Sequence, residues 1–134
     1  MKKAFLSISY KNKDLLKKEI NYIIDTLKEF SIEVIIFVQK YQFKEDKEKD
    51  MMNKAFEEIR DSDVLIAEVS DKAIGVGIEI GYAKALNKPV IYLRNAFTEY
   101  STTVGGSSSY KIVYNGLIDL KEKLYNIISK FIAS

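Results

Sequence analysis

Glu79 is the residue best suited to chemistry in this sequence, because two glycines and a predicted helix start come just before it. In Gly75-Val76-Gly77-Ile78-Glu79 the glycines leave space beside the carboxylate, since they have no Cβ to obstruct a ligand. A carboxylate in the first turn of a helix interacts favourably with the helix dipole, by about 0.3–1 kcal/mol. It stays ionised near neutral pH, as a nucleophile must. The same interaction also suits a purely structural acid.

Two further acids flank the apolar run that precedes these glycines. Asp63 begins that run, where an acid also fits a solvated turn, and an ideal parallel sheet would keep it far from Glu79. Glu68 stands near the end of the run, closer to the predicted site, where it could instead partner a buried hydroxyl or backbone amide. Spacing alone therefore pairs neither acid with Glu79.

The composition limits which other chemistry is possible. The 134 residues contain no cysteine and no histidine, which excludes thiolate and histidine metal sites, cysteine nucleophiles and Ser-His-Asp catalysis. We therefore expect no metal and no cofactor. A net charge of +2 is too small to indicate a nucleic acid polymer as partner. No apolar run is long enough to span a membrane and no signal peptide is recognisable, so we expect a cytoplasmic protein.

Hydroxyl groups are predicted at the same edge as Glu79. Ser7-Ile8-Ser9-Tyr10 ends the first predicted strand, and the Ser/Thr/Gly-rich segment from Thr98 to Ser109 follows a later one. The latter segment has no periodicity, which is typical of a flexible surface loop, although its hydroxyls could bind phosphate or sugar oxygens. Gly75-x-Gly77 lacks the full dinucleotide fingerprint, and a Walker-type phosphate loop is missing from the sequence.

Alternation of strand and helix patterns predicts how these residues are positioned. Apolar helical stripes separate the predicted strands; those strands are Ala4–Ser9, Ile32–Val38, Val64–Val69, Val90–Leu93 and Tyr110–Tyr114. This order indicates one α/β domain over residues 1–134, a flavodoxin-like or Rossmann-like doubly wound sandwich with a five-stranded parallel sheet. The helix after the glycines is expected to begin at about Ile78, so that Ser70–Glu79 is the ligand-binding loop.

One charged segment allows two interpretations. Gln39–Asp50 interleaves lysines with acids, as a solvated loop or the frayed start of a helix does. It could also be a flap over the site, with Tyr41 or Phe43 stacking on a base. Met51–Ile59 is predicted to continue as a short amphipathic helix.

The sequence resembles the nucleoside 2-deoxyribosyltransferase superfamily, and most closely its 2′-deoxynucleoside 5′-phosphate N-hydrolases. Three runs carry the resemblance: Asp63–Val69, Gly75–Gly81 and Asn87–Val90. It implies that Glu79 attacks the anomeric carbon of a nucleoside or nucleotide, and that Asp63 protonates the departing base. It also implies a homodimer in which Ser101 binds phosphate in the neighbouring subunit's site. Ser7, Ile8, Ser9, Tyr10, Gly75 and Gly77 would bind the rest of the substrate.

The chain also departs from that family pattern. Ser7–Asn12 replaces a glycine-rich turn, Phe5 replaces a tyrosine, and Ala73 replaces a second phosphate-binding serine. The need for a 5′-phosphate therefore stays open. The start of the chain, Phe5–Tyr10 followed by Asp14, resembles TIR domains, some of which cleave NAD at its N-glycosidic bond. Two alternatives follow: a TIR-like NAD hydrolase or signalling protein, and a non-catalytic nucleotide-binding module.

Overall fold

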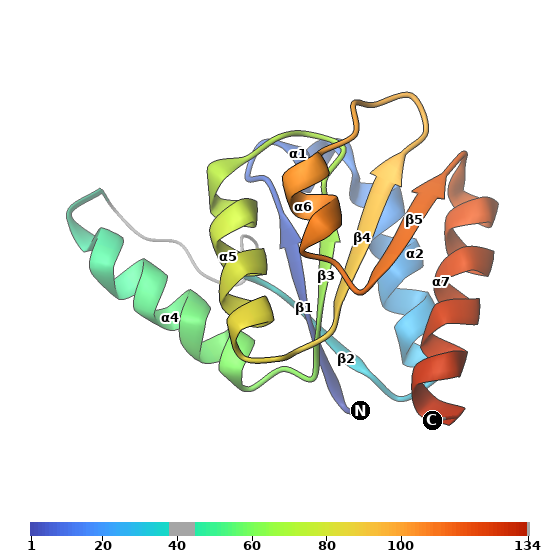
Figure 1. Cartoon of the computed structure of the whole chain (residues 1–134), viewed down its shortest axis with the longest axis horizontal. Helices are drawn as coiled ribbons and strands as arrows, with labels where there is room; N and C mark the ends of the chain where they lie inside the picture. Colours follow the sequence, from blue (N-terminus) through green and yellow to red (C-terminus); the bar gives the residue numbers. More distant parts are fainter. Residues whose placement is uncertain (38–44, 134) are drawn as a thin grey trace.

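Five parallel strands form the central sheet of the computed structural model, which describes residues 1–37 and 45–133 (Figure 1). The strands are β1 (Lys3–Ile8), β2 (Glu33–Ile36), β3 (Val64–Glu68), β4 (Val90–Asn95) and β5 (Tyr110–Tyr114). They lie in the order β2-β1-β3-β4-β5, and every neighbouring pair is parallel. The order reverses between β1 and β3, which is where doubly wound sheets bind ligands. The predicted fold class is confirmed.

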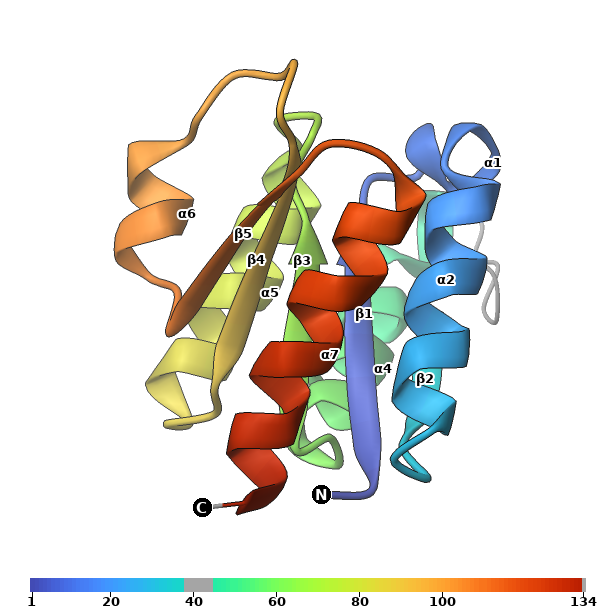
Figure 2. The same ribbon diagram turned by 90° about the vertical axis from the view of Figure 1, so that its right-hand side faces the viewer.

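Helices cover both faces of this sheet (Figure 2). They are α1 (Asn12–Leu15), α2 (Lys17–Lys28), the 3-10 turn η1 (Glu45–Lys47), α4 (Glu48–Arg60), α5 (Ile74–Ala85), α6 (Thr102–Gly106) and α7 (Leu117–Ala133). α2 and α7 bury their apolar sides on one face, and α4 and α5 bury theirs on the other. β3 contributes to both cores because it is buried along its whole length, as the unbroken apolar run predicts.

Helix α5 begins four residues earlier than the sequence predicts, at Ile74 instead of about Ile78. Gly75 and Gly77 are therefore helical residues, and among the described glycines only Gly116 has a positive φ. Burial of Val76 and Ile80 against the sheet outweighs the poor helix propensity of glycine. The loop that follows β3 is consequently shorter than expected and ends at Ala73.

The segment from Thr98 to Ser109 is also more regular than the predicted flexible loop. It contains α6, whose first N–H groups are capped when the Ser101 Oγ accepts a hydrogen bond from the Val104 N–H at 3.3 Å. Tyr100 packs closely on Gly105, where an added Cβ would lie only 2.1 Å from the Tyr100 hydroxyl oxygen. These contacts hold a hydroxyl-rich segment in a defined place.

The charged segment before α4 is described only in part. Its last residues form η1 and the first turn of α4, so the predicted amphipathic helix extends from Glu48 to Arg60. Residues 38–44 lie outside the described part of the chain, and with them the suggested stacking of Tyr41 or Phe43. Among the described helices, none is long and apolar enough to cross a membrane.

Candidate active site

Glu79 lines a cavity of about 270 Å³ at the carboxyl edge of the sheet. The walls come from the end of β1, the start of α5 and the first half of α4, together with Phe37. The lining residues are Ile8, Ser9, Tyr10, Phe37, Met51, Met52, Ala55, Ala73, Gly75, Val76 and Glu79. Among these described lining residues Glu79 is the only charged one, and most of the others are apolar.

Glu79 is half-buried, and among the described residues one hydrogen bond holds its carboxyl group. The Ser7 hydroxyl donates to Glu79 Oε1 at 2.6 Å, and Ser7 itself is buried on β1. Burial raises the pKa of Glu79 to about 7, against the opposing effect of the hydrogen bond from Ser7. Glu79 is the sixth residue of α5, and the first turn of that helix contains no acid. The expectation of a dipole-stabilised carboxylate was therefore wrong: burial, and not the helix dipole, governs its ionisation.

The end of β1 brings three more predicted residues to this cavity. Ile8 and Ser9 are buried, and Tyr10 is 67% exposed at the rim. Ser9 Oγ is buried and has no hydrogen-bond partner among the residues that the structure describes. A buried hydroxyl without a partner is unusual in a folded protein, and here it belongs to a residue that lines the cavity. It is available to a ligand.

The start of α5 forms another wall and exposes backbone to the cavity. Ala73 is the N-cap residue, and no side chain in the described part of the chain caps the first N–H groups of the helix. Cβ atoms added at Gly75 or Gly77 would meet nothing within 4 Å. The glycines thus leave open space around the helix start, as predicted, although they do so within a helix and not within a loop.

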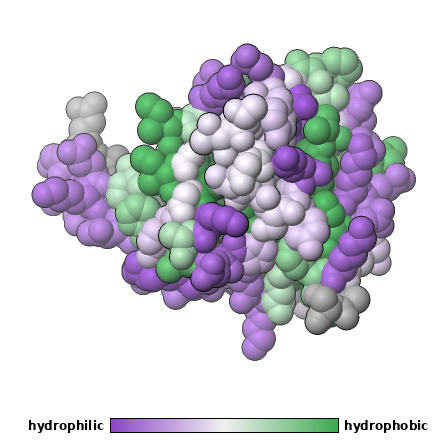
Figure 3. Space-filling view, in the orientation of Figure 1, coloured by the Kyte–Doolittle hydropathy of each residue, from purple (hydrophilic) through white to green (hydrophobic). Residues whose placement is uncertain are grey.

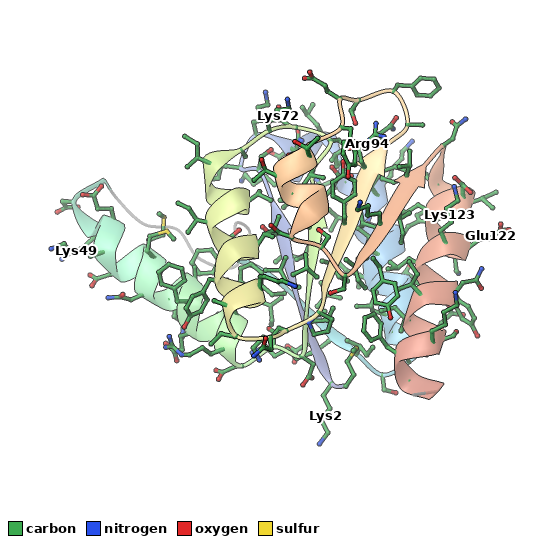
Figure 4. All side chains as sticks on the ribbon, in the orientation of Figure 1. Lys2, Lys49, Lys72, Arg94, Glu122 and Lys123 are labelled. Atoms are coloured by element: carbon green, nitrogen blue, oxygen red, sulfur yellow. The ribbon has the colours of Figure 1, made fainter. Side chains whose placement is uncertain are left out.

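A second cavity, of about 290 Å³, lies between the start of α5 and α6. Gly77 and Ser101 line it together with Lys72, whose position in the β3–α5 loop at the carboxyl edge is visible in Figure 4. The two cavities share Ala73 and Val76 as lining residues. Within one chain, therefore, Ser101 lies in a different cavity from Glu79.

Asp63 is not brought near Glu79. Its Oδ2 accepts hydrogen bonds from the backbone N–H groups of Lys2 and Lys3 at 2.7 and 3.0 Å, at the amino edge of the sheet, where Figure 4 shows Lys2. Lys3 and Ser7 are four residues apart on β1, which at about 3.3 Å per residue is about 13 Å. The role implied for Asp63, protonating the departing base, does not fit this position. The position does agree with the large separation between Asp63 and Glu79 that an ideal parallel sheet predicts.

Glu68 also points away from the Glu79 cavity. Its carboxylate accepts hydrogen bonds from the Tyr114 hydroxyl and the Ser70 N–H, each at 2.6 Å. It is thus a partner for both a buried hydroxyl and a backbone amide, which confirms the structural interpretation of this acid.

Sequence reasoning missed the wall opposite β1. Phe37, Met51 and Met52 line the Glu79 cavity, although their spacing indicated only a strand end and an amphipathic helix. No local signal identified this wall, because neighbouring apolar residues on a helix can both face the core. Methionine readily lines binding surfaces because its side chain is flexible and polarizable.

Comparison with known proteins identifies the family of this chain. Residues 10–126 match the family described as nucleoside 2-deoxyribosyltransferase. A Syntrophotalea carbinolica protein named as a 2′-deoxynucleoside 5′-phosphate N-hydrolase is 40% identical over 65 residues, which are 46% of this chain and 46% of that protein. The match thus spans about half the length of this curated relative.

Solved structures share the fold over nearly the whole chain. The CMP N-glycosidase of Clostridium botulinum has a TM-score of 0.69 and 26% identity, covering 94% of this chain and 99% of that one. A 2-deoxyribosyltransferase from Bacillus psychrosaccharolyticus has a TM-score of 0.67 and 17% identity, covering 91% and 95%, and shows the fold alone. With the family match extending over most of its residues, this chain belongs to the nucleoside 2-deoxyribosyltransferase family.

Proposed function

We propose that this protein cleaves, or transfers at, the N-glycosidic bond of a nucleoside or nucleoside 5′-monophosphate, with Glu79 as the nucleophile. The observation that carries the proposal is the position of the Glu79 carboxyl, which lines a cavity at the carboxyl edge of the sheet while Ser7 holds one of its oxygens. The family match supports the same class of reaction.

The proposed chemistry follows the retaining mechanism of glycosidases. The Ser7 hydroxyl orients Oε1, and the carboxylate attacks C1′ of the sugar to form a glycosyl ester. The base leaves with the electron pair of the N-glycosidic bond and takes up a proton. Water or a second base then attacks C1′ and releases the carboxylate. Asp63 has no part in this mechanism, because it lies at the opposite edge of the sheet.

Two features of the cavity suit the polar part of the substrate. Within residues 1–37 and 45–133, the buried Ser9 hydroxyl has no partner and the first N–H groups of α5 have no side-chain cap. A helix N-terminus favours negative charge and hydroxyl acceptors. We propose that sugar hydroxyls or a 5′-phosphate bind there. The opposite wall, with Phe37, Met51 and Met52, would face the base through apolar contacts.

We also propose that the active form is a homodimer that shares its sites. α5 carries two exposed isoleucines, Ile74 and Ile78, at 86% and 47%, and Figure 3 shows hydrophobic surface along this helix beside the more neutral surface of α6. Ser101 lies outside its own chain's Glu79 cavity, which suits a residue that serves the neighbouring subunit.

Mixing two inactive variants tests whether sites are shared. If Ser101 acts in the partner's site, Glu79→Gln and Ser101→Ala dimers are each impaired, and exchanging their subunits restores one intact site per mixed dimer. When equal amounts exchange at random, half of the dimers are mixed and each has one intact site of two, so activity should recover to about a quarter of that of the parent. Sedimentation at matched concentrations should show a dimer. A monomer, or a mixture with no gain in activity, contradicts this part of the proposal.

A substrate panel tests the proposed reaction itself. Purified protein is incubated with purine and pyrimidine nucleosides and their 5′-monophosphates, in ribose and deoxyribose forms, and free base is quantified by chromatography. We expect base release from at least one member, and loss of that release in Glu79→Gln. Comparing each nucleoside with its monophosphate decides whether the phosphate is required.

The same panel separates the two alternatives. A TIR-like enzyme would release nicotinamide from NAD and leave the nucleotides intact. A non-catalytic module would show raised thermal stability with a nucleotide, by mass action, and no turnover. Base release from a nucleoside or its monophosphate that depends on Glu79 contradicts both.

A further inference from the structure

Glu68 is a buried carboxylate that the proposed reaction does not use. It is the last residue of β3, in the middle of the sheet, and is 1% exposed. Its register partners are Ile8 of β1 and Leu93 of β4, and its side chain lies on the α2 and α7 side of the sheet with Tyr114. Burying a carboxyl in such a place is costly unless its oxygens are satisfied, so its partners indicate what it does.

Both oxygens of this carboxyl accept short hydrogen bonds. The Tyr114 hydroxyl donates to Oε2 and the Ser70 N–H donates to Oε1, each at 2.6 Å. Burial raises the pKa of Glu68, and the bonds from Tyr114 and Ser70 oppose that rise. Glu68 therefore connects the end of β5 to the first residues of the loop that follows β3.

The connection continues into β4. Ser70 Oγ accepts a hydrogen bond from the Asn95 N–H at 2.9 Å, and the Val69 N–H donates to the Leu93 carbonyl at 2.8 Å. The carboxyl ends of β3, β4 and β5 are thus joined around one buried acid. That edge of the sheet is also where the two cavities lie.

The joined segment is the one that leads to the nucleophile. Only Ser70–Ala73 separates Glu68 and Val69 from the first residue of α5. The helix start has no side-chain cap. The loop's two ion pairs, Asp71–Lys11 at 3.3 Å and Lys72–Glu99 at 3.2 Å, both involve exposed lysines, and such pairs contribute little. Among the described residues, the hydrogen bonds that Ser70 makes with Glu68 and with the Asn95 N–H are therefore the main polar anchors of this loop.

We propose that Glu68 is a positioning residue for Glu79. By holding the Ser70 N–H it fixes where α5 begins, and so fixes where the Glu79 carboxyl sits in its cavity against Ser7. This inference rests on the proposed function for its kinetic readout, but a direct measurement on the Glu79 carboxyl tests it without any substrate.

Three variants test the proposal. Glu68→Leu removes both hydrogen bonds, because it replaces the carboxyl group with an apolar side chain of similar size. Glu68→Gln keeps an acceptor for the Ser70 N–H and gives Tyr114 a donor. Ser62→Ala is the matched control: it removes a buried hydrogen bond, from Ser62 Oγ to the Glu58 carbonyl at 2.8 Å, just before the opposite end of the same strand.

The direct readout is the titration of the Glu79 carboxyl by carbon-13 NMR, with thermal unfolding in parallel. In the parent the pKa of Glu79 is about 7. We expect Glu68→Leu to lower it by about one unit or more, because a displaced α5 start admits water to the cavity. Glu68→Gln should stay near the parent, and Ser62→Ala should lose stability without any change in this titration.

The kinetic readout is base release by the same proteins. Displacing a reacting group by about 1 Å can cost about 100-fold in rate, so Glu68→Leu should lower kcat by 10- to 100-fold, with most of that loss recovered in Glu68→Gln. If the parent releases no base, the proposed function fails and the titration still decides the role of Glu68.

Two results would overturn the proposal. One is a folded Glu68→Leu protein whose Glu79 titrates as in the parent. The other is an equal shift in Ser62→Ala, which would mean that any loss of stability moves the site. If Glu68→Leu does not fold, Glu68→Met removes the same two bonds with an unbranched, flexible side chain, and an unchanged Glu79 titration in that variant is equally decisive.

Discussion

At the amino edge of the sheet, Asp63 is exposed and accepts hydrogen bonds from two backbone N–H groups. At the carboxyl edge, Glu79 lies in a cavity with one serine hydroxyl as its partner. The bond from Lys2 is the largest of the effects that lower the pKa of Asp63, whereas burial raises the pKa of Glu79 to about 7. The two surroundings thus shift the pKa values of two carboxyl groups of one domain in opposite directions.

This difference separates a structural acid from a candidate catalytic one. Asp63 fastens the N-terminus of the chain to the start of β3 and stays ionised. Glu79 is half-buried, and among the described residues only one of its oxygens accepts a hydrogen bond, so it is poised to change its protonation or bonding state near neutral pH. The two acids should therefore respond differently to every test that distinguishes stability from chemistry.

The largest expected effect is on rate. Glu79→Gln should lower base release at least about 1,000-fold, because removing a nucleophile removes the step itself. Asp63→Asn should leave kcat within about threefold of the parent, since it lies about 13 Å from the site. Rates are measured by base release at saturating substrate. Equal losses of rate in the two variants would contradict the assignment of Glu79 as catalytic and Asp63 as structural.

The next effect is on the pH dependence of stability. The folded protein keeps a proton on Glu79 up to about pH 7, and the unfolded chain loses it at about 4.5. Between those values the folded state binds more protons, so stability falls as pH rises, by on the order of 3 kcal/mol. Denaturant unfolding from pH 4 to 8 should show this fall in the parent. Glu79→Gln should flatten it.

At lower pH, Asp63 should make the free energy of unfolding rise with pH, which is the opposite of the effect of Glu79. The pKa of Asp63 in the folded protein lies below the unfolded value of 3.8. The stability that its ionised form contributes is therefore present above that value and is lost as the solution is acidified further. Asp63→Asn should reduce the acid sensitivity below pH 4 and leave the decline between pH 4.5 and 7 unchanged.

Gly75→Ala should separate stability from binding at the carboxyl edge. Alanine favours a helix by about 0.8–1 kcal/mol over glycine, and the added Cβ meets no protein atom within 4 Å, so the free energy of unfolding should rise. The same methyl group enters space beside the Glu79 cavity, and we expect KM to rise about tenfold. A stabilised variant with unchanged KM would show that substrate does not approach this helix start.

The smallest expected effect is the stability lost in Asp63→Asn at neutral pH. Asn keeps one acceptor for the Lys2 or Lys3 N–H, and the site is exposed, so the loss should be less than about 1 kcal/mol. Urea unfolding at pH 7 measures it. A loss of several kcal/mol would indicate that the amino edge depends on this acid far more than its contacts suggest.

Local patterns in the sequence were sufficient for much of this account. The apolar runs predicted the parallel sheet, and the glycines with Glu79 predicted the edge where the cavities lie. Ser9 and Gly75 were assigned to that edge from their positions after β1 and β3. Each of these inferences depends on neighbours within a few residues, which a sequence displays directly.

Other features depend on contacts between distant segments. The pKa of Glu79 is set by burial under β1 and α4, so the dipole argument gave the wrong direction. The start of α5 at Ile74 depends on packing of Val76 and Ile80 against the sheet. Phe37 and Met51 join the cavity only through tertiary packing. No local pattern indicates that Ser101 faces a separate cavity.

The central claim is that Glu79 forms a covalent bond to the sugar. The most direct measurement is mass spectrometry of the protein quenched with acid during turnover and digested with a protease. We expect the peptide containing Glu79 to gain the mass of the glycosyl group, and the corresponding peptide of Glu79→Gln to gain none. Base release accompanied by a sugar adduct on any other residue would contradict it.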